Sequence, residues 1–262
     1  MAALNALKDI VQKKKEQLAV AQYARSLDEL KSMVQGCAPV RPFREAINKP
    51  KTISLIAEIK RASPSMGVIR ENFDPVAIAN AYQTVGVQAI SVLTESDFFQ
   101  GQLEHLSAVR GAVDVPLLRK DFIIDPYQVY ESRAWGADAI LLIADVLTRE
   151  QLLELMQLAD SLGLDYVVEV QDEKQLKKVL NCKVPIIGIN NRDLQTLKVD
   201  LKITERLFPL VPKDKVVVVE SGIQSYQDVL FLKILGVQAI LVGTAFMQAD
   251  DIVRKVETLM GW

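Results

Sequence analysis

Short runs of β-branched and leucine residues alternate along this chain with longer segments whose apolar residues recur at helical spacing. The short runs are nearly continuous in Val, Ile and Leu, which is typical of parallel strands buried on both faces. Eight such runs cover residues 53–59, 88–94, 115–120, 138–144, 165–170, 185–190, 215–220 and 239–243. The helical segments between them include 75–86, 126–137, 149–163 and 225–236. This alternation predicts a parallel sheet covered by helices.

The number of units favours closure into a barrel, which commonly takes about 250 residues as one domain. An open doubly wound sheet usually has fewer strands and a glycine-rich first turn, and no GxGxxG follows any strand here. The repeated segments GVQAI, GADAI and GVQAI each place a glycine at a helix end, directly before a strand. We therefore predict an α/β protein whose residues 48–262 form a (β/α)8 TIM barrel.

Residues 1–47 precede the first strand and are predicted to be a helical extension of the same structural domain. Residues 4–22 are amphipathic, and Ser26 is a candidate N-cap with Glu29 at the N3 position. Two prolines in 36–46 indicate a surface linker that leads into a short helix. We expect the extension to pack on the barrel, either capping it or covering its mouth.

Composition excludes several classes of partner. The chain has 31 basic and 33 acidic residues, a formal charge of -2, and no long block of like charge. We therefore expect no nucleic-acid partner. The longest apolar runs are far below the roughly 18 residues that span a bilayer, and no signal peptide opens the sequence, so we expect no membrane partner and no secretion. Two cysteines, Cys37 and Cys182, suit a reducing cytoplasm.

Carboxylates and lysines are the candidate acid–base groups. His105 is the single histidine, it falls in a predicted helix, and the Cys and His positions show no metal-ligand spacing. Glu58 and Lys60 are two residues apart in the first strand, so their side chains share one face. Taken alone, this pair could be an ion pair on an edge strand.

Polar residues end five of the predicted strands, and barrel enzymes carry their chemistry at the carboxyl ends of strands. The residues at these ends are Glu58, Lys60, Arg119, Lys120, Asp121, Glu169, Asn190, Asn191, Arg192, Glu220 and Ser221. Lysines and carboxylates at the same rim position of different strands indicate an active site, and a structural ion-pair network is the alternative.

The loops after the last two strands indicate a phosphate site. Gly222, Gly243 and the backbone amide of Thr244 lie where the backbone can approach an anion closely. Ordinary turn glycines are the alternative for each loop. Lys60 and Arg192 could add positive charge, and the 61–75 loop, which contains Ser63, is long enough to be an active-site lid.

Seven segments in this order resemble the indole-3-glycerol phosphate synthase family: AEIKRASPSMG, TESDFFQG, LLRKDFI, VVEVQD, IGINNRDL, VVESGI and LVGTAFM. The resemblance covers essentially the whole chain. It implies a barrel that acts without metal or organic cofactor, as a monomer or sometimes a dimer. The implied small-molecule substrate is 1-(2-carboxyphenylamino)-1-deoxyribulose 5-phosphate, and the products are indole-3-glycerol phosphate, carbon dioxide and water.

The resemblance also implies roles for residues. The catalytic group is Glu58, Lys60, Lys120, Glu169, Asn190 and Ser221, with Lys120 as general acid and Glu169 as base. The substrate-binding group is Ser63, Phe99, Phe122, Leu141, Arg192 and Glu220, in which Phe99, Phe122 and Leu141 would sandwich the aromatic ring. The phosphate group is Gly222, Gly243 and Thr244, and Thr244 departs from the serine or glutamate frequent in relatives.

Three alternatives stay open at this point. Phe99, Phe122 and Leu141 could simply be core residues. The chain could be another phosphate-binding barrel, such as a phosphoribosyl isomerase, although such enzymes usually carry aspartate or cysteine at the ends of strands 1 and 5. It could also be a catalytically silent barrel. The sequence does not decide which lysine serves which proton transfer.

Overall fold

The computed structural model describes residues 6–262, which form a closed barrel of parallel strands. The barrel strands are β1 (Ser54–Ile59), β4 (Ala89–Leu93), β5 (Leu117–Lys120), β6 (Ala139–Ile143), β7 (Asp165–Val170), β8 (Ile186–Asn190), β9 (Val216–Glu220) and β10 (Ala239–Val242). Strand β1 pairs with both β4 and β10, which closes the sheet. Each predicted strand is present with bounds shifted by at most two residues, so the (β/α)8 prediction is confirmed.

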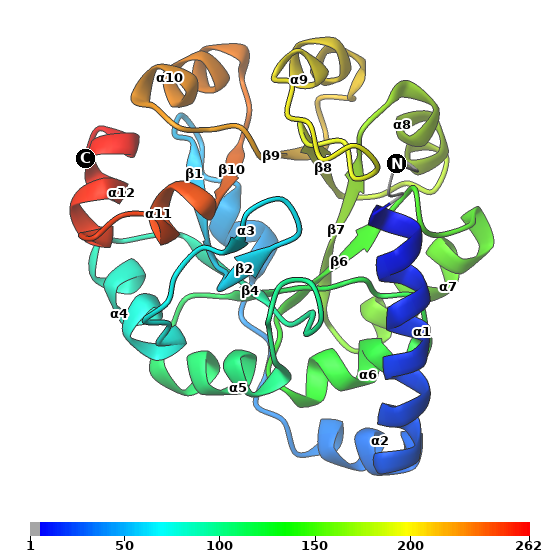
Figure 1. Cartoon of the computed structure of the whole chain (residues 1–262). Helices are drawn as coiled ribbons and strands as arrows, with labels where there is room; N and C mark the ends of the chain where they lie inside the picture. Colours follow the sequence, from blue (N-terminus) through cyan, green and yellow to red (C-terminus); the bar gives the residue numbers. More distant parts are fainter. Residues whose placement is uncertain (1–5) are drawn as a thin grey trace, which may run out of the picture.

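Helices surround the strands, as Figure 1 shows. They are α4 (Pro75–Thr84), α5 (Leu103–Ala112), α6 (Pro126–Ala134), α7 (Arg149–Ser161), α8 (Glu173–Leu180), α9 (Lys202–Leu207) with the 3-10 turn η1 (Phe208–Leu210), α10 (Tyr226–Leu235), α11 (Thr244–Met247) and α12 (Ile252–Met260). A short hairpin of β2 (Ala62–Ser63) and β3 (Gly67–Val68), absent from the prediction, folds the loop after β1. Within the described part of the chain, no helix combines the length and apolarity that a bilayer span requires.

The three glycines of the repeated segments end helices, as predicted. Gly86, Gly136 and Gly236 have φ angles of 86°, 90° and 102°. This left-handed conformation turns the chain back toward the next strand, and a side chain would strain it.

Two apolar layers hold the barrel together. Alternate strand residues such as Ile56, Val167 and Leu241 fill the interior. Their neighbours, such as Leu55, Val168 and Ile240, pack under the surrounding helices. Because both faces of each strand are covered, the strands need apolar residues at nearly every position, which is the pattern seen in the sequence.

The N-terminal segment forms α1 (Ala6–Ala24), α2 (Leu27–Gln35) and α3 (Phe43–Ile47). Residues 1–5 of the predicted extension lie outside the described residues. Ser26 and Glu29 form the predicted capping box at the start of α2, and the short helix after the proline linker is α3. Helix α2 lies beside α6, at the lower right in Figure 1.

Helix α3 closes the amino-terminal end of the barrel. Phe43 and Ile47 are fully buried among the interior residues. The backbone amide of Arg44 donates to Asp165, the first residue of β7, at 2.9 Å. The amide of Arg41 donates to Asp138, just before β6, at 2.6 Å. Helix α3 therefore leaves the other end of the barrel, where the carboxyl ends of the strands lie, uncovered.

Candidate active site

A cavity of about 980 Å³ opens at the carboxyl ends of the barrel strands. The predicted residues that line it are Glu58, Lys60, Phe99, Lys120, Phe122, Leu141, Glu169, Asn190, Arg192, Glu220, Ser221, Gly222, Gly243 and Thr244. Ser63 lines a smaller recess that shares Lys60, Phe99, Phe122 and Arg192 with this cavity. All the residues to which the family resemblance assigned roles therefore face one continuous site.

Lys120, at the end of β5, lies between two buried carboxylates. Its ammonium Nζ is 2.6 Å from Glu220 Oε2 and 3.3 Å from Glu169 Oε2. Oε1 of each carboxylate is buried and has no hydrogen-bond partner among the described residues. Each of these oxygens therefore has unused capacity to accept a hydrogen bond.

Burial and charge act in opposite directions on this cluster. Burial by itself would lower the pKa of Lys120, but the charges of Glu220, Glu169 and Glu58 outweigh it and hold the pKa above its ordinary value. Burial raises the pKa of Glu220 to about 7. The charge of Lys120 opposes this shift, and the charge of Glu169 adds to it. Near neutral pH the cluster can thus exchange a proton through Glu220 while Lys120 stays charged.

Glu220→Gln should remove a pH dependence of stability. Because the folded chain holds the Glu220 proton more tightly than the unfolded chain, this group stabilises the fold fully below its ordinary pKa. That contribution is lost as the pH rises through the folded pKa of about 7. Relative to the variant, the free energy of unfolding of the native chain should fall by about 1 kcal/mol between pH 6 and pH 8. Urea denaturation checks this, and a pH-independent difference would contradict the raised pKa.

Glu58 and Lys60 form a second ion pair across the same cavity, with Nζ 2.6 Å from Glu58 Oε1. Both face the interior, as strand alternation predicts, so the edge-strand alternative is wrong. A Cβ built on Gly243 would lie 2.3 Å from Glu58 Oε1. Since φ of Gly243 is -132°, the turn itself does not demand glycine there, and the close approach of Glu58 does.

An apolar wall lines one side of the cavity. The Phe99 and Phe122 rings lie with centroids 6.4 Å apart and planes tilted by 37°. Phe122 and Leu141 are also buried in the barrel interior, whereas Phe99 is only packed against it. Phe122 and Leu141 thus belong to the core and also line the cavity, and Phe99 is the most accessible of the three.

The loops after β8 and β9 form the opposite side. Ser221 and Gly222 both have left-handed φ angles, 65° and 84°, an unusual conformation for serine. The side chain of Asn191 donates to the Ser221 carbonyl at 3.1 Å and so holds this turn. Arg192 donates to the carbonyl of Leu197 at 2.8 Å. Burial lowers the pKa of its guanidinium, and the charge of Glu58 opposes that shift.

Two of the polar residues predicted at strand ends, Arg119 and Asn191, do not line the cavity. Arg119 points into the helix layer, where it pairs with Asp121 at 3.0 Å and with Glu131 of α6 at 2.8 Å. The cause is strand alternation, because Arg119 and Lys120 must face opposite sides of β5. The Asn191 carboxamide accepts from the Thr204 hydroxyl at 2.8 Å, so its role is to fix the loop.

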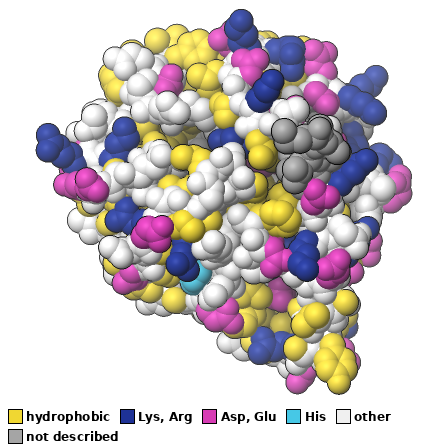
Figure 2. All heavy atoms as spheres, in the orientation of Figure 1, with side chains coloured by type: hydrophobic (Ala, Val, Ile, Leu, Met, Phe, Trp, Pro, Cys, Tyr) yellow, Lys and Arg dark blue, Asp and Glu magenta, His cyan; other side chains and the backbone are white. Residues whose placement is uncertain are grey.

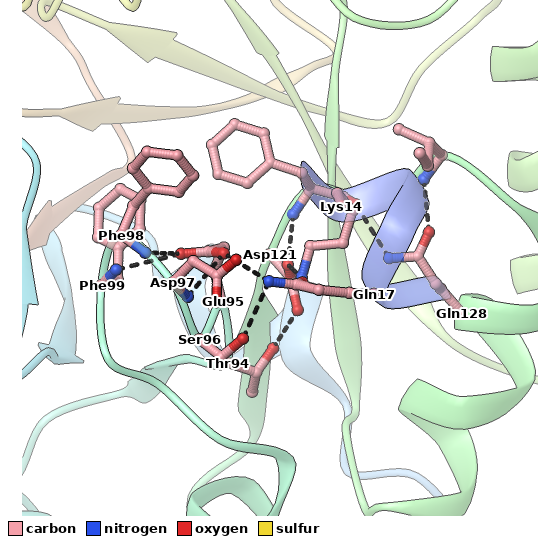
Figure 3. Close-up of polar contacts among 12 residues, drawn as sticks. Lys14, Gln17, Thr94, Glu95, Ser96, Asp97, Phe98, Phe99, Asp121 and Gln128 are labelled. Carbon is pink, nitrogen blue, oxygen red and sulfur yellow. Dashed lines mark hydrogen bonds and ion pairs between the residues drawn. The ribbon is translucent and has the colours of Figure 1, made fainter. Parts of the chain in front are cut away.

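Helix α1 reaches over the cavity mouth, a contact that the sequence did not specify. Lys14 forms a buried ion pair with Asp121 at 2.8 Å, and Gln17 donates to Ser96 at 3.0 Å and to Glu95 at 3.3 Å (Figure 3). The Glu95 carboxylate accepts from the backbone amide of Phe99 at 3.1 Å. One helix therefore holds the two loops that carry Phe99 and Phe122.

Other residues of the cavity wall carried no sequence signal. Met66 from the loop after β1, Gln224 after β9, Gln248 after α11 and Lys255 of α12 line it. Strand-end patterns single out residues on strands, and these four lie on loops and on an outer helix. A search of the segment after each strand for amide and ammonium groups would have included Gln224 and Gln248.

Comparison with known proteins gives one consistent result. A family model described as indole-3-glycerol phosphate synthase matches residues 7–259. A protein of that name from Acetivibrio thermocellus is 47% identical over 252 residues, 95% of this chain and 97% of the relative. One from Geobacillus kaustophilus is 52% identical over 223 residues, 84% of this chain and 86% of the relative. Among solved structures, 3-hexulose-6-phosphate synthase from Salmonella typhimurium superposes with a TM-score of 0.63 at 14% identity, covering 79% of this chain and 98% of that one, which shows a shared fold.

Proposed function

This chain belongs to the indole-3-glycerol phosphate synthase family, and from that membership we propose that the cavity closes the indole ring by lysine and glutamate acid–base catalysis. The family are carboxy-lyases of tryptophan biosynthesis, so the isomerase and silent-barrel alternatives lose their support. One observation carries the catalytic proposal. Lys120 lies within 3.3 Å of both Glu169 and Glu220, with the Glu58–Lys60 pair in the same cavity.

The first step needs an acid beside the ketose oxygen. The ring carbon that bears the carboxylate attacks the carbonyl carbon, and the carbonyl π electrons move to oxygen. That oxygen takes a proton from Lys120, whose raised pKa keeps it charged until negative charge develops. The bond to the carboxylate then breaks, carbon dioxide leaves, and its bonding electrons restore the aromatic ring.

The second step removes water. The new hydroxyl departs with a proton from an ammonium, either Lys60 or the reprotonated Lys120. Glu169 takes a proton from the neighbouring carbon, and the electrons of that C–H bond form the pyrrole double bond. Glu58 and Glu220 would return protons to the two lysines. Glu220 is suited to this relay because its pKa is about 7.

Binding roles follow from the two sides of the cavity. The wall of Phe99, Phe122 and Leu141 would hold the planar anthranilate ring. Asn190, Glu220 and Ser221 would hold hydroxyl and carboxylate groups. The phosphate would lie near Lys60, Ser63, Arg192, Gly222, Gly243 and Thr244, and Lys255 adds an ammonium to the same cavity.

We also propose a small-molecule phosphorylated substrate as the physiological partner and the cytoplasm as the location. The free thiols of Cys37 and Cys182 support a reducing compartment. The division of the single domain into an extension, 1–47, and a barrel, 48–262, is likewise proposed, supported by the docking of α1 and α3 on opposite barrel ends.

An indole-forming fluorescence assay tests this function. The purified chain, mixed with 1-(2-carboxyphenylamino)-1-deoxyribulose 5-phosphate, should produce indole-3-glycerol phosphate without added metal or organic cofactor. The absence of product at high enzyme concentration, from a chain shown to be folded by circular dichroism, would refute it.

A further inference from the structure

Glu95 is a buried acidic residue without a cationic partner. Figure 2 shows acidic side chains at the molecular surface, several of them next to Lys or Arg side chains. Glu95, by contrast, is 0% exposed, although Ser96 and Asp97 directly after it are exposed. None of the ion pairs in the described part of the chain involves Glu95. Burying a carboxylate is costly, so other groups must compensate for its charge.

Backbone amides take the place of a cation. Glu95 Oε2 accepts from the amides of Phe98 at 2.7 Å and Phe99 at 3.1 Å, as Figure 3 shows. Oε1 accepts from the amide of Asp97 at 3.1 Å, and the Gln17 carboxamide adds a fourth donor at 3.3 Å. Three successive amides that point at one carboxylate fix the turn to which they belong.

The backbone of Glu95 closes the same loop. Its carbonyl accepts from the Gly101 amide at 2.7 Å. Gly101 packs so closely on the end of β4 that an added Cβ would lie 2.4 Å from the Leu93 carbonyl oxygen. The Phe99 carbonyl in turn accepts from the amide of Ala62, in the loop after β1, at 3.2 Å. Glu95 therefore holds the turn that joins Phe99 to two neighbouring parts of the site.

Phe99 is the residue that this turn presents to the site. It lines both the cavity and the smaller recess, and its ring centroid is 6.4 Å from that of Phe122. The Phe122 amide donates to Oδ1 of the buried Asp121 at 2.8 Å. Each aromatic residue of the cavity wall thus has its backbone amide bound by a buried carboxylate.

We propose that Glu95 is a positioning residue, which holds Phe99 in place against the aromatic ring of the substrate. This inference rests on the proposed function, in which Phe99, Phe122 and Leu141 bind that ring. Phe122 and Leu141 are fixed by core packing, whereas Phe99 is only packed against the core and needs another support. Glu95 lines neither the cavity nor the recess, so it acts through Phe99 and does not touch the substrate.

Glu95→Gln tests the proposal, because every group around the carboxylate is a donor. A carboxamide has one accepting oxygen and an NH2 group that is itself a donor, so no orientation satisfies all three backbone amides. We expect kcat/KM to fall by about 10- to 100-fold, since a misplacement of about 1 Å can cost that much.

Binding can be measured apart from turnover. The probe is the alcohol analogue of the substrate, in which a hydroxyl group replaces the ketose carbonyl so that the ring cannot close. The fluorescence of its anthranilate group reports the Kd. We expect Glu95→Gln to raise this Kd by about tenfold, because the ring loses an ordered aromatic contact.

A double-mutant cycle with Phe99→Ala separates positioning from a general loss of stability. If Glu95 acts through Phe99, adding Glu95→Gln to Phe99→Ala should change kcat/KM and Kd by less than about threefold. A purely structural role would lower the free energy of unfolding and leave both values native in the folded single variant. If circular dichroism shows that Glu95→Gln does not fold, Glu95→Asp replaces it in the cycle. It keeps the charge, is one methylene shorter, and should show the same dependence on Phe99.

Glu104→Gln is the matched control. Glu104 is exposed at the start of α5, three residues beyond the end of the same loop, and lines neither the cavity nor the recess. This variant should keep native kcat/KM and Kd.

Four results would overturn the proposal. One is a folded Glu95→Gln variant with kcat/KM and Kd within about threefold of native. The others are an equally large loss in the Phe99→Ala background, native values for Phe99→Ala itself, and a native chain that does not bind the analogue. A native chain that binds the analogue but forms no product would refute the catalytic proposal alone, and the Kd values would still test Glu95.

Discussion

Lys120→Met is expected to lower kcat by about 10²- to 10⁴-fold, the range that positioned general acids supply. Methionine keeps the length and apolar character of the lysine stem but removes the ammonium that lies 2.6 Å from Glu220. The chain should lose stability, because two buried carboxylates are left without their ammonium, but it should stay folded, because the lost group faces the cavity and packs into neither apolar layer.

The same variant should also change the cluster that remains. The charge of Lys120 lowers the pKa of Glu220, so its removal should raise that pKa further above 7. Steady-state kinetics by product fluorescence, with circular dichroism as the folding check, tests the loss of rate. A matched variant is Lys174→Met, an exposed lysine of α8 outside the cavity, which should keep native kcat. If Lys120→Met retains kcat within about threefold, Lys120 has no part in proton transfer.

Lys14→Met should lower the free energy of unfolding by about 3 kcal/mol, because it breaks a buried ion pair and leaves its partner charged. The side chains of Lys14 and Asp121 are 7% and 1% exposed. Although burial opposes ionisation, Lys14 and Arg119 hold the pKa of Asp121 well below its usual range. The stability from this pair is therefore present above the ordinary aspartate pKa and is lost only as the pH falls through the lowered one.

Lys13→Met provides the control for this prediction. Lys13 precedes Lys14 on α1 and pairs with Glu16 at 3.0 Å, but both side chains are about half exposed. Its replacement should leave the free energy of unfolding nearly unchanged, because water screens the exposed pair. Urea denaturation of the three chains at neutral pH makes the comparison, and equal values for the two variants would show that the Lys14–Asp121 contact adds no stability.

Much of the barrel could be predicted because its rules are local. Strand alternation places Glu58 and Lys60 on one face, and it also requires Arg119 to turn away from Lys120, a consequence missed in the sequence analysis. Glycines before strands mark helix ends because they can adopt the left-handed conformation that turns the chain. These features depend on residues within a few positions of one another, so they can be predicted from the sequence.

Contacts between distant segments could not be predicted in this way. Lys14 and Asp121 meet only because α1 crosses the mouth of a closed barrel, and no spacing in the sequence signals that. Glu220, to which the family resemblance gave a role in substrate binding, lies nearer to the Lys120 ammonium than Glu169 does, and no spacing in the sequence signals that distance. Lys255 lines the cavity from α12, where a partly buried lysine looks like any other surface residue.

The N-terminal segment is attached to both ends of the barrel, and this sets an order of events during synthesis. This segment leaves the ribosome before the barrel strands, and its anchoring partners Asp121, Asp138 and Asp165 are translated about 100 residues later. At ribosomal speeds of about 5–20 residues per second, the segment waits on the order of ten seconds without its partners. Phe43 and Ile47, apolar and destined for burial, are exposed to chaperones during that interval. The N-terminal segment thus cannot reach its native position until Asp165 has been translated.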